Sequence, residues 1–443
     1  MAHPGSSNAL LDAVRSGASG PELLELDLPA RYRAAYTLKD EVGIFEGHAD
    51  KDVRRSLHVG EVEMPEPAPD ECVVAVMSAA INFNTVWSAI FEPVPTFAFL
   101  ERFGRRGPHG ARHDLPYHVL GSDGAGVVVR TGSGVRRWKA GDKVVLSPAY
   151  MDEEDHGSYD DAMMSEDPLA WGFETNFGSL GDFCLVKANQ LIRKPAHLTW
   201  EEAGASTLCA ATAYRMLVGP HGARMKQGDV VLVWGATGGL GSYATQLVKN
   251  GGGIPVAVVS SDEKAALVRA QGCEHVINRN DLDLGEQGLR HPKAGRLLGE
   301  AIRRLVGEDP GIVFEYLGRE TFGASVYVAK RGGRIVTCGS STGYRHEYDN
   351  RFLWMRLKSI IGSHGFNYHE AVETNRLIAL GMIHPTVSTV FPLDEAGEAT
   401  RAVQTNRHVG KVAVLCAAAE EGQGVDDHAL RDRLADRLHL YRR

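Results

Sequence analysis

Hydrophobic and polar positions change their spacing several times along the chain, and each change predicts a different kind of element. Between residues 56 and 148, short stretches of alternating apolar and polar residues are separated by Gly and Pro, which is typical of β-strands. Between about 206 and 365, apolar runs of strand length alternate with segments of helical spacing, which predicts a parallel sheet with crossover helices. The late stretch VGKVAVLC (409–416) again has strand character, and we expect it to rejoin the first region.

These changes predict an α/β protein in which a doubly wound parallel sheet of the Rossmann type interrupts a β-rich domain. We place an N-terminal extension and the β-rich domain at residues 1–205, the Rossmann domain at 206–365 and the return to the β-rich domain at 366–443. A chain of 443 residues is too long for one compact core, which agrees with this division. We expect the reactive groups to lie in a cleft between the domains.

The segment VVLVWGATGGLGSYATQLVKN (230–250) has the clearest chemical meaning. An apolar strand meets a glycine-rich loop, and a helix-forming segment begins directly after that loop. Such a loop lets backbone N–H groups and the positive end of a helix approach a pyrophosphate, so we expect a dinucleotide site here rather than a glycine turn without a ligand. The residues expected to contact the dinucleotide are Gly235, Thr237, Gly238, Gly239, Leu240 and Gly241.

The end of the next strand indicates which dinucleotide binds. A carboxylate at this position would accept hydrogen bonds from the ribose of NAD, but the strand ends at Ser260 and Ser261, and Lys264 lies one helical turn later. Hydroxyl groups and an ammonium favour the 2′-phosphate of NADPH. Alternatively, Ser260 and Glu263 form an ordinary capping box and Lys264 is a solvated charge. Asp262 would repel the phosphate unless its side chain points away.

Composition excludes several other classes of protein. The net charge is −8 and 43% of the residues are hydrophobic, so nucleic acid is not an expected partner. No stretch approaches the roughly 18 consecutive apolar residues that cross a membrane, and the amino terminus lacks the pattern of a secretion signal. We therefore expect a cytoplasmic protein without a membrane partner. The six cysteines form no C-x-x-C pair and are expected to be core residues.

The strings LGSDGAGVV (120–128), WKAGDKVV (138–145) and GKVAV (410–414), together with the glycine loop, resemble the medium-chain dehydrogenase/reductase superfamily. This resemblance implies a GroES-like fold for the β-rich domain. It also implies further cofactor contacts, at Thr212, Gly339, Ser340 and Lys411.

The same resemblance bears on metal binding. Zinc alcohol dehydrogenases of the superfamily have thiolate and imidazole ligands where this chain has Asn84 and the pair Ser122-Asp123. Zinc needs such ligands to assemble a catalytic site. We therefore expect no zinc and no other metal.

A closer resemblance is to the crotonyl-CoA carboxylase/reductases and related 2-enoyl-CoA carboxylase/reductases. It is carried by strings that are unusual among general reductases: INFNTVW (81–87), WGFETNFGSL (171–180), GRETFGASVY (318–327), HEYDNRFLWM (346–355) and IIGSHG (360–365). The resemblance implies that NADPH reduces a 2-enoyl-CoA and that CO2, as co-substrate, is captured on the resulting enolate to give an alkylmalonyl-CoA, without biotin. It also implies a homotetramer assembled as a dimer of dimers.

The family resemblance assigns the reacting centre to four side chains. It implies that Asn84 and His364 donate hydrogen bonds to the CO2 oxygens, that Glu174 acts through an ordered water and that Phe173 shields the pocket. An enolate that must react with CO2 needs fixed donors and the exclusion of protons, which suits this set. Asn82 is an alternative to Asn84, and each residue also has a purely structural interpretation.

Other positions bear on the substrate. The chain has Gly365 and Val372 where the crotonyl enzymes carry Phe and Trp, and the loss of bulk near His364 predicts a longer or branched acyl chain that supplies a polyketide extender unit. The family string around Tyr316 and Leu317 also differs here, and we assign these two residues no role. Cations are needed to bind the phosphates of CoA, although solvated surface charge is the alternative. The candidates are Arg351, Arg331 and Lys330.

Two other functions remain compatible with the sequence. The first is plain NADPH-dependent reduction of an enoyl-CoA or a quinone, in which a proton rather than CO2 quenches the enolate. The second is a catalytically silent protein that only binds NADPH.

Overall fold

The computed structural model describes residues 8–152 and 154–442. They form two compact units: unit 1 contains the residues up to Leu208 together with Val387–Arg433, and unit 2 contains Cys209–Thr386 together with Leu434–Arg442. Within this part of the chain, no helix combines the length and the apolar character needed to cross a membrane.

Unit 2 extends past the boundary expected at residue 365. The reason is the packing of α13 (Tyr368–Ala379), which follows that boundary. The Arg215 guanidinium on α7 (Thr207–Leu217) donates to the Glu370 carboxylate on α13 at 2.9 Å, and both side chains are buried. This ion pair joins α13 to α7, most of which belongs to unit 2.

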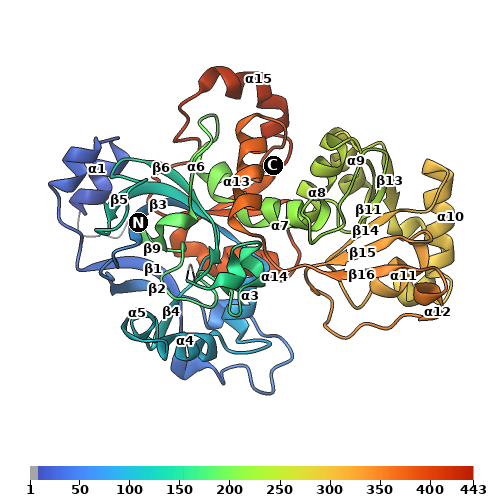
Figure 1. Ribbon diagram of the computed structural model, residues 1–443, viewed down its shortest axis with the longest axis horizontal. Helices are drawn as coiled ribbons and strands as arrows, with labels where there is room; N and C mark the ends of the chain where they lie inside the picture. The colour runs from blue at the N-terminus through green and yellow to red at the C-terminus, as the bar shows by residue number, and fades with distance from the viewer. Residues whose placement is uncertain (1–7, 153, 443) are drawn as a thin grey trace. The chain divides into compact units, whose positions relative to one another are not determined.

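The main sheet of unit 1 has the strand order β10-β6-β5-β3-β18-β17, and β9 also pairs with β3 (Figure 1). The late strand β18 lies antiparallel to β3, with Val412 opposite Ile81, so the strand after the Rossmann region does return to the first domain. The bounds are β3 Glu71–Ile81, β5 Gly124–Thr131, β6 Lys143–Leu146, β9 Phe183–Lys187, β10 Leu191–Arg193, β17 Val387–Pro392 and β18 Lys411–Leu415.

Shorter elements complete unit 1. A second sheet has the order β2-β1-β4, and β7 pairs with β8. The strands are β1 Arg31–Leu38, β2 His58–Glu63, β4 Tyr117–Val119, β7 Ala149–Tyr150 and β8 Leu169–Ala170. The helices are α1 Ala9–Arg15, α2 Gly20–Leu24, α3 Phe83–Ile90, α4 Thr96–Gly104, α5 Pro108–Ala111, α6 Trp200–Gly204 and α14 Ala396–Gln404.

Unit 2 contains a wholly parallel sheet in the order β13-β12-β11-β14-β15-β16. Numbered from its first strand, this is the 3-2-1-4-5-6 order of a doubly wound dinucleotide-binding fold, which confirms the predicted fold class. The strands are β11 Val230–Val233, β12 Ile254–Val259, β13 His275–Asn278, β14 Ile312–Glu315, β15 Arg334–Thr337 and β16 Ser359–Gly362. The remaining helices of unit 2 are α8 Gly239–Asn250, α9 Asp262–Ala270, α10 Ala294–Val306, α11 Phe322–Val328 and α12 Arg351–Trp354. Helix α15 (His428–Leu438) begins in unit 1 and ends in unit 2.

The central strands of this sheet are buried on both faces, which explains why they appear in the sequence as continuous apolar runs. All four residues of β11 and of β14 are buried. The strand order reverses between these two strands, so the loops after them meet at the carboxyl edge of the sheet, where such folds bind ligands.

Candidate active site

The glycine loop of unit 2 lies at this reversal point. Gly235 follows β11 with φ +55°, a left-handed conformation that favours glycine, and Gly238 is the N-cap of α8. A Cβ at Gly241 would lie 2.3 Å from the Gly235 carbonyl oxygen, so only glycine lets α8 approach the loop this closely. The first-turn N–H groups of α8, which have no acceptor within the helix, can therefore reach a pyrophosphate.

Tyr316, for which no role was predicted, lies across this loop. It follows β14, and its hydroxyl donates to the Gly235 carbonyl oxygen at 2.8 Å. Burial raises the pKa of Tyr316, so its hydroxyl keeps the proton that it donates. A Cβ at Gly235 would lie 2.5 Å from the same hydroxyl oxygen. Tyr316 and Gly235 thus fit together and fix the shape of the loop.

The polar residues predicted to contact the 2′-phosphate lie together after β12. The Lys264 ammonium lies 3.3 Å from the Ser260 hydroxyl, so a cation and a hydroxyl converge at the strand end. The Asp262 carboxylate accepts from the Asn278 amide at 3.0 Å and is thereby turned toward β13. The helix cap differs from the alternative considered above, because Ser261, not Ser260, accepts the Lys264 N–H.

Two further predicted cofactor contacts lie at the same edge of the sheet. Gly339 and Ser340 follow β15, and the next N–H, that of Ser341, donates to the Tyr316 carbonyl oxygen at 3.4 Å. Thr212 lies on α7 and is buried, as is Thr237 in the glycine loop. The parallel sheet therefore gathers residues of three loops beside the glycine loop.

Lys411 is placed differently from the prediction. It begins β18 in unit 1, is 2% exposed, and its ammonium donates to the side-chain oxygen of Asn82 and to the Ile81 carbonyl oxygen at 3.2 Å. The ammonium also lies 3.5 Å from the Asp123 carboxylate. Because these groups of unit 1 hold the ammonium in the interior, this placement does not support the predicted contact with the cofactor.

The two candidate asparagines occupy different environments. Asn82 is 5% exposed, and its amide lies between Lys411 and Asp123. Asn84 lies in the first turn of α3 and is half-buried, and its amide donates to the Ser122 hydroxyl at 2.8 Å. Among the described residues, the side-chain oxygen of Asn84 has no hydrogen-bond partner. The amide nitrogen of Asn84 has two N–H groups, of which one is used toward Ser122, so the other can donate to a ligand. The amide of Asn82 is instead held between Lys411 and Asp123, which favours Asn84 over Asn82.

Glu174 and Phe173 lie in the segment that follows β8. The Glu174 carboxylate accepts the Ala170 N–H at 2.7 Å, and desolvation raises the pKa of Glu174 although this hydrogen bond opposes the shift. The Phe173 ring packs on Phe99 of α4 with ring centroids 6.0 Å apart. Helix α4 thus supplies one wall against which Phe173 rests.

Backbone pairing joins this segment to Ser122. The N–H groups of Gly178 and Ser179 donate to the carbonyl oxygens of Val119 and Gly121, each at 3.0 Å. Within unit 1, hydrogen bonds therefore connect Asn84 through Ser122 to the segment that carries Phe173 and Glu174, although these segments are far apart in the sequence.

His364 belongs to unit 2, two residues after β16. The residue is exposed overall, yet atoms around the imidazole desolvate it, and this desolvation together with the Arg215 guanidinium lowers the pKa of His364. The imidazole is therefore neutral near pH 7, with one nitrogen that donates and one that accepts.

The predicted CoA contacts are exposed cations in unit 2, each of which bonds a nearby carboxylate or carbonyl oxygen. The Arg351 guanidinium pairs with Asp349 at 2.6 Å, Arg331 donates to the Met355 carbonyl oxygen at 3.0 Å, and Lys330 lies 3.2 Å from Glu308. Val372 on α13 is 48% exposed, and Gly365 follows His364.

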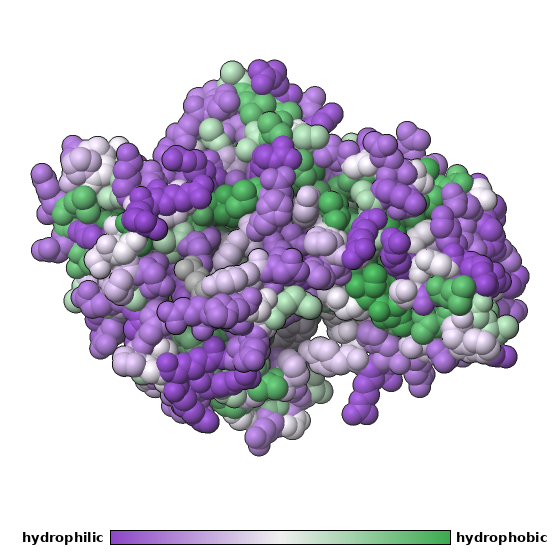
Figure 2. All heavy atoms as spheres, in the orientation of Figure 1, coloured by the Kyte–Doolittle hydropathy of each residue, from purple (hydrophilic) through white to green (hydrophobic). Residues whose placement is uncertain are grey.

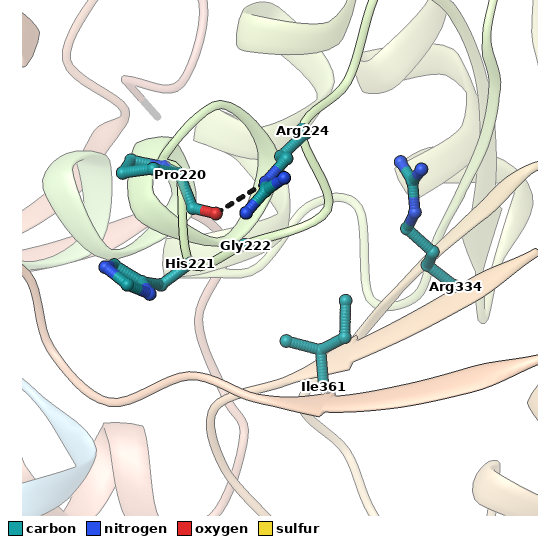
Figure 3. Close-up of a pocket in the computed structure, with 6 residues that line it drawn as sticks. All are labelled: Pro220, His221, Gly222, Arg224, Arg334 and Ile361. Atoms are coloured by element: carbon teal, nitrogen blue, oxygen red, sulfur yellow. Dashed lines mark hydrogen bonds between the residues drawn. The ribbon is translucent and has the colours of Figure 1, made fainter.

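A cavity of about 320 Å³ also lies in unit 2 (Figure 3). Figure 3 shows Arg224 folded back so that its Nε donates to the Pro220 carbonyl oxygen at 2.6 Å, while Arg334 projects from β15 toward the same space. The cavity is lined by Pro220, His221, Gly222, Arg224, Arg334 and Ile361. Because none of the predicted site residues lines it, we assign this cavity no part in the reaction.

Among the residues that the structure describes, one group has donor atoms spaced as in a metal site. The donor atoms of Glu71, His109 and His113 lie within 4.8 Å of one another. The Asn176 N–H donates to Nδ1 of His113 at 3.1 Å, so neutral His113 carries its proton on Nε2, which then cannot bind a metal. Both Glu71 oxygens accept from Arg112 at 2.5 Å. The group is a hydrogen-bonded ion pair and does not fit a zinc centre.

Comparison with protein families defines the class. The family described as alcohol dehydrogenase GroES-like domain matches residues 68–196, and the family described as zinc-binding dehydrogenase matches residues 239–379. A GroES-like unit with a parallel sheet in dinucleotide-binding order defines a medium-chain dehydrogenase/reductase.

Comparison with individual proteins narrows this class. The chain is 53% identical to the crotonyl-CoA reductase of Streptomyces collinus over 440 residues, 98% of each chain. It is 38% identical to the crotonyl-CoA carboxylase/reductase of Cereibacter sphaeroides over 391 residues, 85% of this chain and 87% of that protein. The chain belongs to the crotonyl-CoA carboxylase/reductase family, as its sequence motifs predicted.

A solved structure is similar to this chain throughout. It is that of the 2-octenoyl-CoA carboxylase reductase CinF in complex with NADP and 2-octenoyl-CoA, with a TM-score of 0.95, 58% sequence identity and coverage of 98% of both chains.

Proposed function

We propose that this chain catalyses the NADPH-dependent reductive carboxylation of a 2-enoyl-CoA to an alkylmalonyl-CoA. The observation that carries this proposal is the similarity, over 98% of both chains, to a carboxylase reductase solved with NADP and 2-octenoyl-CoA. The residues on which the proposed chemistry depends are all present in this chain.

The chemistry assigns a task to each side chain. NADPH, when bound, supplies a hydride to the β-carbon, and the electron pair of the double bond moves to the α-carbon and the thioester oxygen as an enolate. A new bond between the α-carbon and CO2 leaves the negative charge on a carboxylate and releases no proton. The protein must therefore hold CO2 beside the α-carbon and keep proton donors away from it.

The polar residues of the site are suited to these tasks. We assign the Asn84 amide to donate to a CO2 oxygen, and its hydrogen bond to Ser122 fixes the plane of that amide. The Glu174 carboxylate fixes a water, while Phe173, supported by Phe99, excludes bulk solvent. His364 is a neutral imidazole and donates to CO2 without offering the readily released proton of an imidazolium.

For the cofactor, we assign the pyrophosphate to the glycine loop and the 2′-phosphate to Ser260, Ser261 and Lys264. The open left-handed turn at Gly235 and the ammonium beside the Ser260 hydroxyl support this assignment. The Asp262 carboxylate, held by Asn278, is turned aside and does not oppose it. Thr212, Gly339 and Ser340 remain proposed contacts to the rest of the cofactor.

For the acyl-CoA, we assign the phosphates to Arg351, Arg331 and Lys330. The exposed ion pairs of Arg351 and Lys330 contribute little to stability, and Arg331 bonds only a backbone carbonyl oxygen, so a phosphate can replace these partners at low cost. The small residues Gly365 and Val372 support a chain longer than crotonyl, such as the octenoyl chain of the similar enzyme. Such a product suits use as a polyketide extender unit.

Product analysis tests the reaction. Purified enzyme, NADPH and 2-octenoyl-CoA are incubated with and without bicarbonate, and the products are weighed by mass spectrometry. We expect hexylmalonyl-CoA with bicarbonate and octanoyl-CoA without it. Octanoyl-CoA under both conditions would establish plain enoyl reduction instead, and no NADPH oxidation would indicate a protein that only binds the cofactor.

Competition between substrates tests the acyl chain. With equal amounts of crotonyl-CoA and 2-octenoyl-CoA, we expect a higher kcat/KM for the octenoyl substrate. A preference for crotonyl-CoA would reject the roles of Gly365 and Val372 but would leave the reaction itself intact.

We also propose a zinc-independent, cytoplasmic homotetramer assembled from dimers. Strand β16 ends its sheet, and exposed apolar side chains precede or lie on it: Trp354, Met355, Leu357 and Ile360. Figure 2 shows apolar groups on the visible face of unit 2 in the region of β15 and β16. An open strand edge with apolar neighbours favours pairing with a second copy. Light scattering should give four chains, and treatment with a chelator should leave activity unchanged.

A further inference from the structure

Unit 1 contains a buried polar triad, Lys411, Asn82 and Asp123, for which the proposed reaction has no direct use. The Lys411 ammonium donates to the Asn82 side-chain oxygen and lies 3.5 Å from the Asp123 carboxylate, and the Asn82 amide donates to the same carboxylate at 3.4 Å. The three side chains are at most 5% exposed. Each member thus contacts the other two.

The triad holds both groups that determine how Asn84 is oriented. Asn82 is the N-cap of α3, so fixing it fixes the first turn that carries Asn84. Asp123 adjoins Ser122 in the chain, and the Ser122 hydroxyl accepts from the Asn84 amide at 2.8 Å. Lys411 is therefore connected to Asn84 in two ways, through Asn82 at the start of α3 and through Asp123 and the Ser122 hydroxyl.

The backbone of Asp123 extends the connection to the third segment of the site. The Asp123 carbonyl oxygen accepts from the Ser179 hydroxyl at 2.7 Å. Ser179 belongs to the same segment (171–180) as Phe173 and Glu174. The Asp123 carboxylate also accepts the Leu208 N–H at 3.2 Å. All segments of unit 1 that carry proposed site residues are thus tied to one ion pair.

Electrostatics indicates that this arrangement serves orientation rather than stability alone. Burying two opposite charges gains little over two well-packed apolar groups, so such pairs are weak evidence for stability. Hydrogen bonds are directional, however, and here they set the direction in which the Asn82 amide faces. Apolar side chains in the same place would not fix the orientation of the Asn82 amide.

We infer that Lys411 and Asp123 are positioning residues for carboxylation, which hold the Asn84 amide where it can orient CO2 beside the enolate. This inference rests on the proposed function. It predicts that disturbing the triad changes the fate of the enolate more than its formation, because hydride transfer does not require Asn84.

The test measures the ratio of alkylmalonyl-CoA to saturated acyl-CoA that is formed with bicarbonate present. The main variant is the double substitution K411M/D123N, which removes both charges and so leaves neither buried without a partner. We expect the carboxylated fraction to fall roughly tenfold, as small misplacements of orienting groups do, while the KM for NADPH stays within about twofold of wild type.

Two further variants separate positioning from stability. S122A removes the acceptor of Asn84 without touching the ion pair and should lower the carboxylated fraction by a smaller factor. K194M is the matched control, because Lys194 is another buried ammonium of unit 1, bound to the carbonyl oxygens of Pro195 and Gly424. It should lower the melting temperature but leave the product ratio unchanged.

The outcomes distinguish the two levels of the proposal. If wild type carboxylates and K411M/D123N keeps the wild-type ratio, the positioning role of Lys411 and Asp123 is wrong. If K411M/D123N does not fold, N82S decides by the same criterion, because it keeps both charges and a helix-capping side chain but removes the amide that lies between them. If wild type gives only saturated product, the proposed function fails and takes the positioning role with it.

Discussion

The glycine loop of unit 2 and the Asn84 region of unit 1, which we propose as ligand sites, are built by different means. The loop presents backbone N–H groups, and its shape depends on Gly235 and Gly238 between β11 and α8. The Asn84 region uses side chains from distant segments, which are held together by Lys411 on a late strand. Sites made of backbone are therefore sensitive to added volume, whereas sites made of side chains are sensitive to lost hydrogen bonds.

The largest effect is expected from adding volume to the loop. G235A places a side chain at φ +55° and directs its Cβ to within 2.5 Å of the Tyr316 hydroxyl. We expect NADPH affinity to fall about 100-fold, in line with roughly 3 kcal/mol of lost binding energy, as measured by titration calorimetry.

The matched control for this variant is G285A. Gly285 has φ +54° and no atom within 4 Å of an added Cβ, so it carries the same backbone strain of about 1–2 kcal/mol without the crowding. If both variants weaken NADPH binding equally, backbone strain rather than volume in the loop is responsible.

In unit 1, the largest effect is expected from Glu174. E174Q keeps the size of the side chain but removes the charge, and we expect the carboxylation rate to fall about 100-fold, with NADPH affinity unchanged. The exposed Glu166 provides the control variant E166Q, which should behave as wild type. An equal loss of NADPH binding in E174Q would mean that the effect is not confined to the reacting centre.

The pH dependence of the product ratio provides a finer comparison. We propose that the carboxylate form of Glu174 is the active one, and desolvation raises its pKa above the ordinary value. As pH falls through this raised pKa, Glu174 gains a proton and the carboxylated fraction should decline. His364, whose pKa is lowered, should gain a proton at a lower pH than an ordinary histidine. E174Q should not show the decline of the carboxylated fraction that protonation of Glu174 causes. If E174Q still shows that decline, another group is responsible for it.

The smallest effect is expected from removing the Tyr316 hydroxyl, which supports the glycine loop. Y316F removes the hydrogen bond to the Gly235 carbonyl oxygen but keeps the ring, so the KM for NADPH should rise about threefold to tenfold. Y441F is the control, since Tyr441 is also buried in unit 2 and donates to Gln271 at 3.1 Å. An unchanged KM in Y316F would mean that the loop keeps its shape without Tyr316.

These two regions also differ in how far the sequence predicted them. The parallel sheet, the glycine loop and the polar end of β12 follow from patterns that are local in sequence, because each strand and its loop are contiguous. The sequence suggested that Asp262 would be harmless only if it pointed away, and Asn278, on the next strand, determines that it does.

Contacts between segments that are distant in sequence were harder to predict. The sequence placed Lys411 at the cofactor because its motif resembles superfamily contacts, but the pairing of β18 with β3 directs it to Asn82. The role of Tyr316 depends on the meeting of β14 with the β11 loop, which no local pattern reveals. The end of unit 2 beyond residue 365 likewise depends on the ion pair between Arg215 and Glu370.

The most direct test of the account is the stoichiometry between NADPH oxidised and labelled bicarbonate carbon fixed during turnover of 2-octenoyl-CoA. The account predicts one carbon fixed for each NADPH consumed at saturating bicarbonate, since the enolate is shielded from protons while CO2 is held beside it. Oxidation of NADPH at an undiminished rate without fixed label would contradict it.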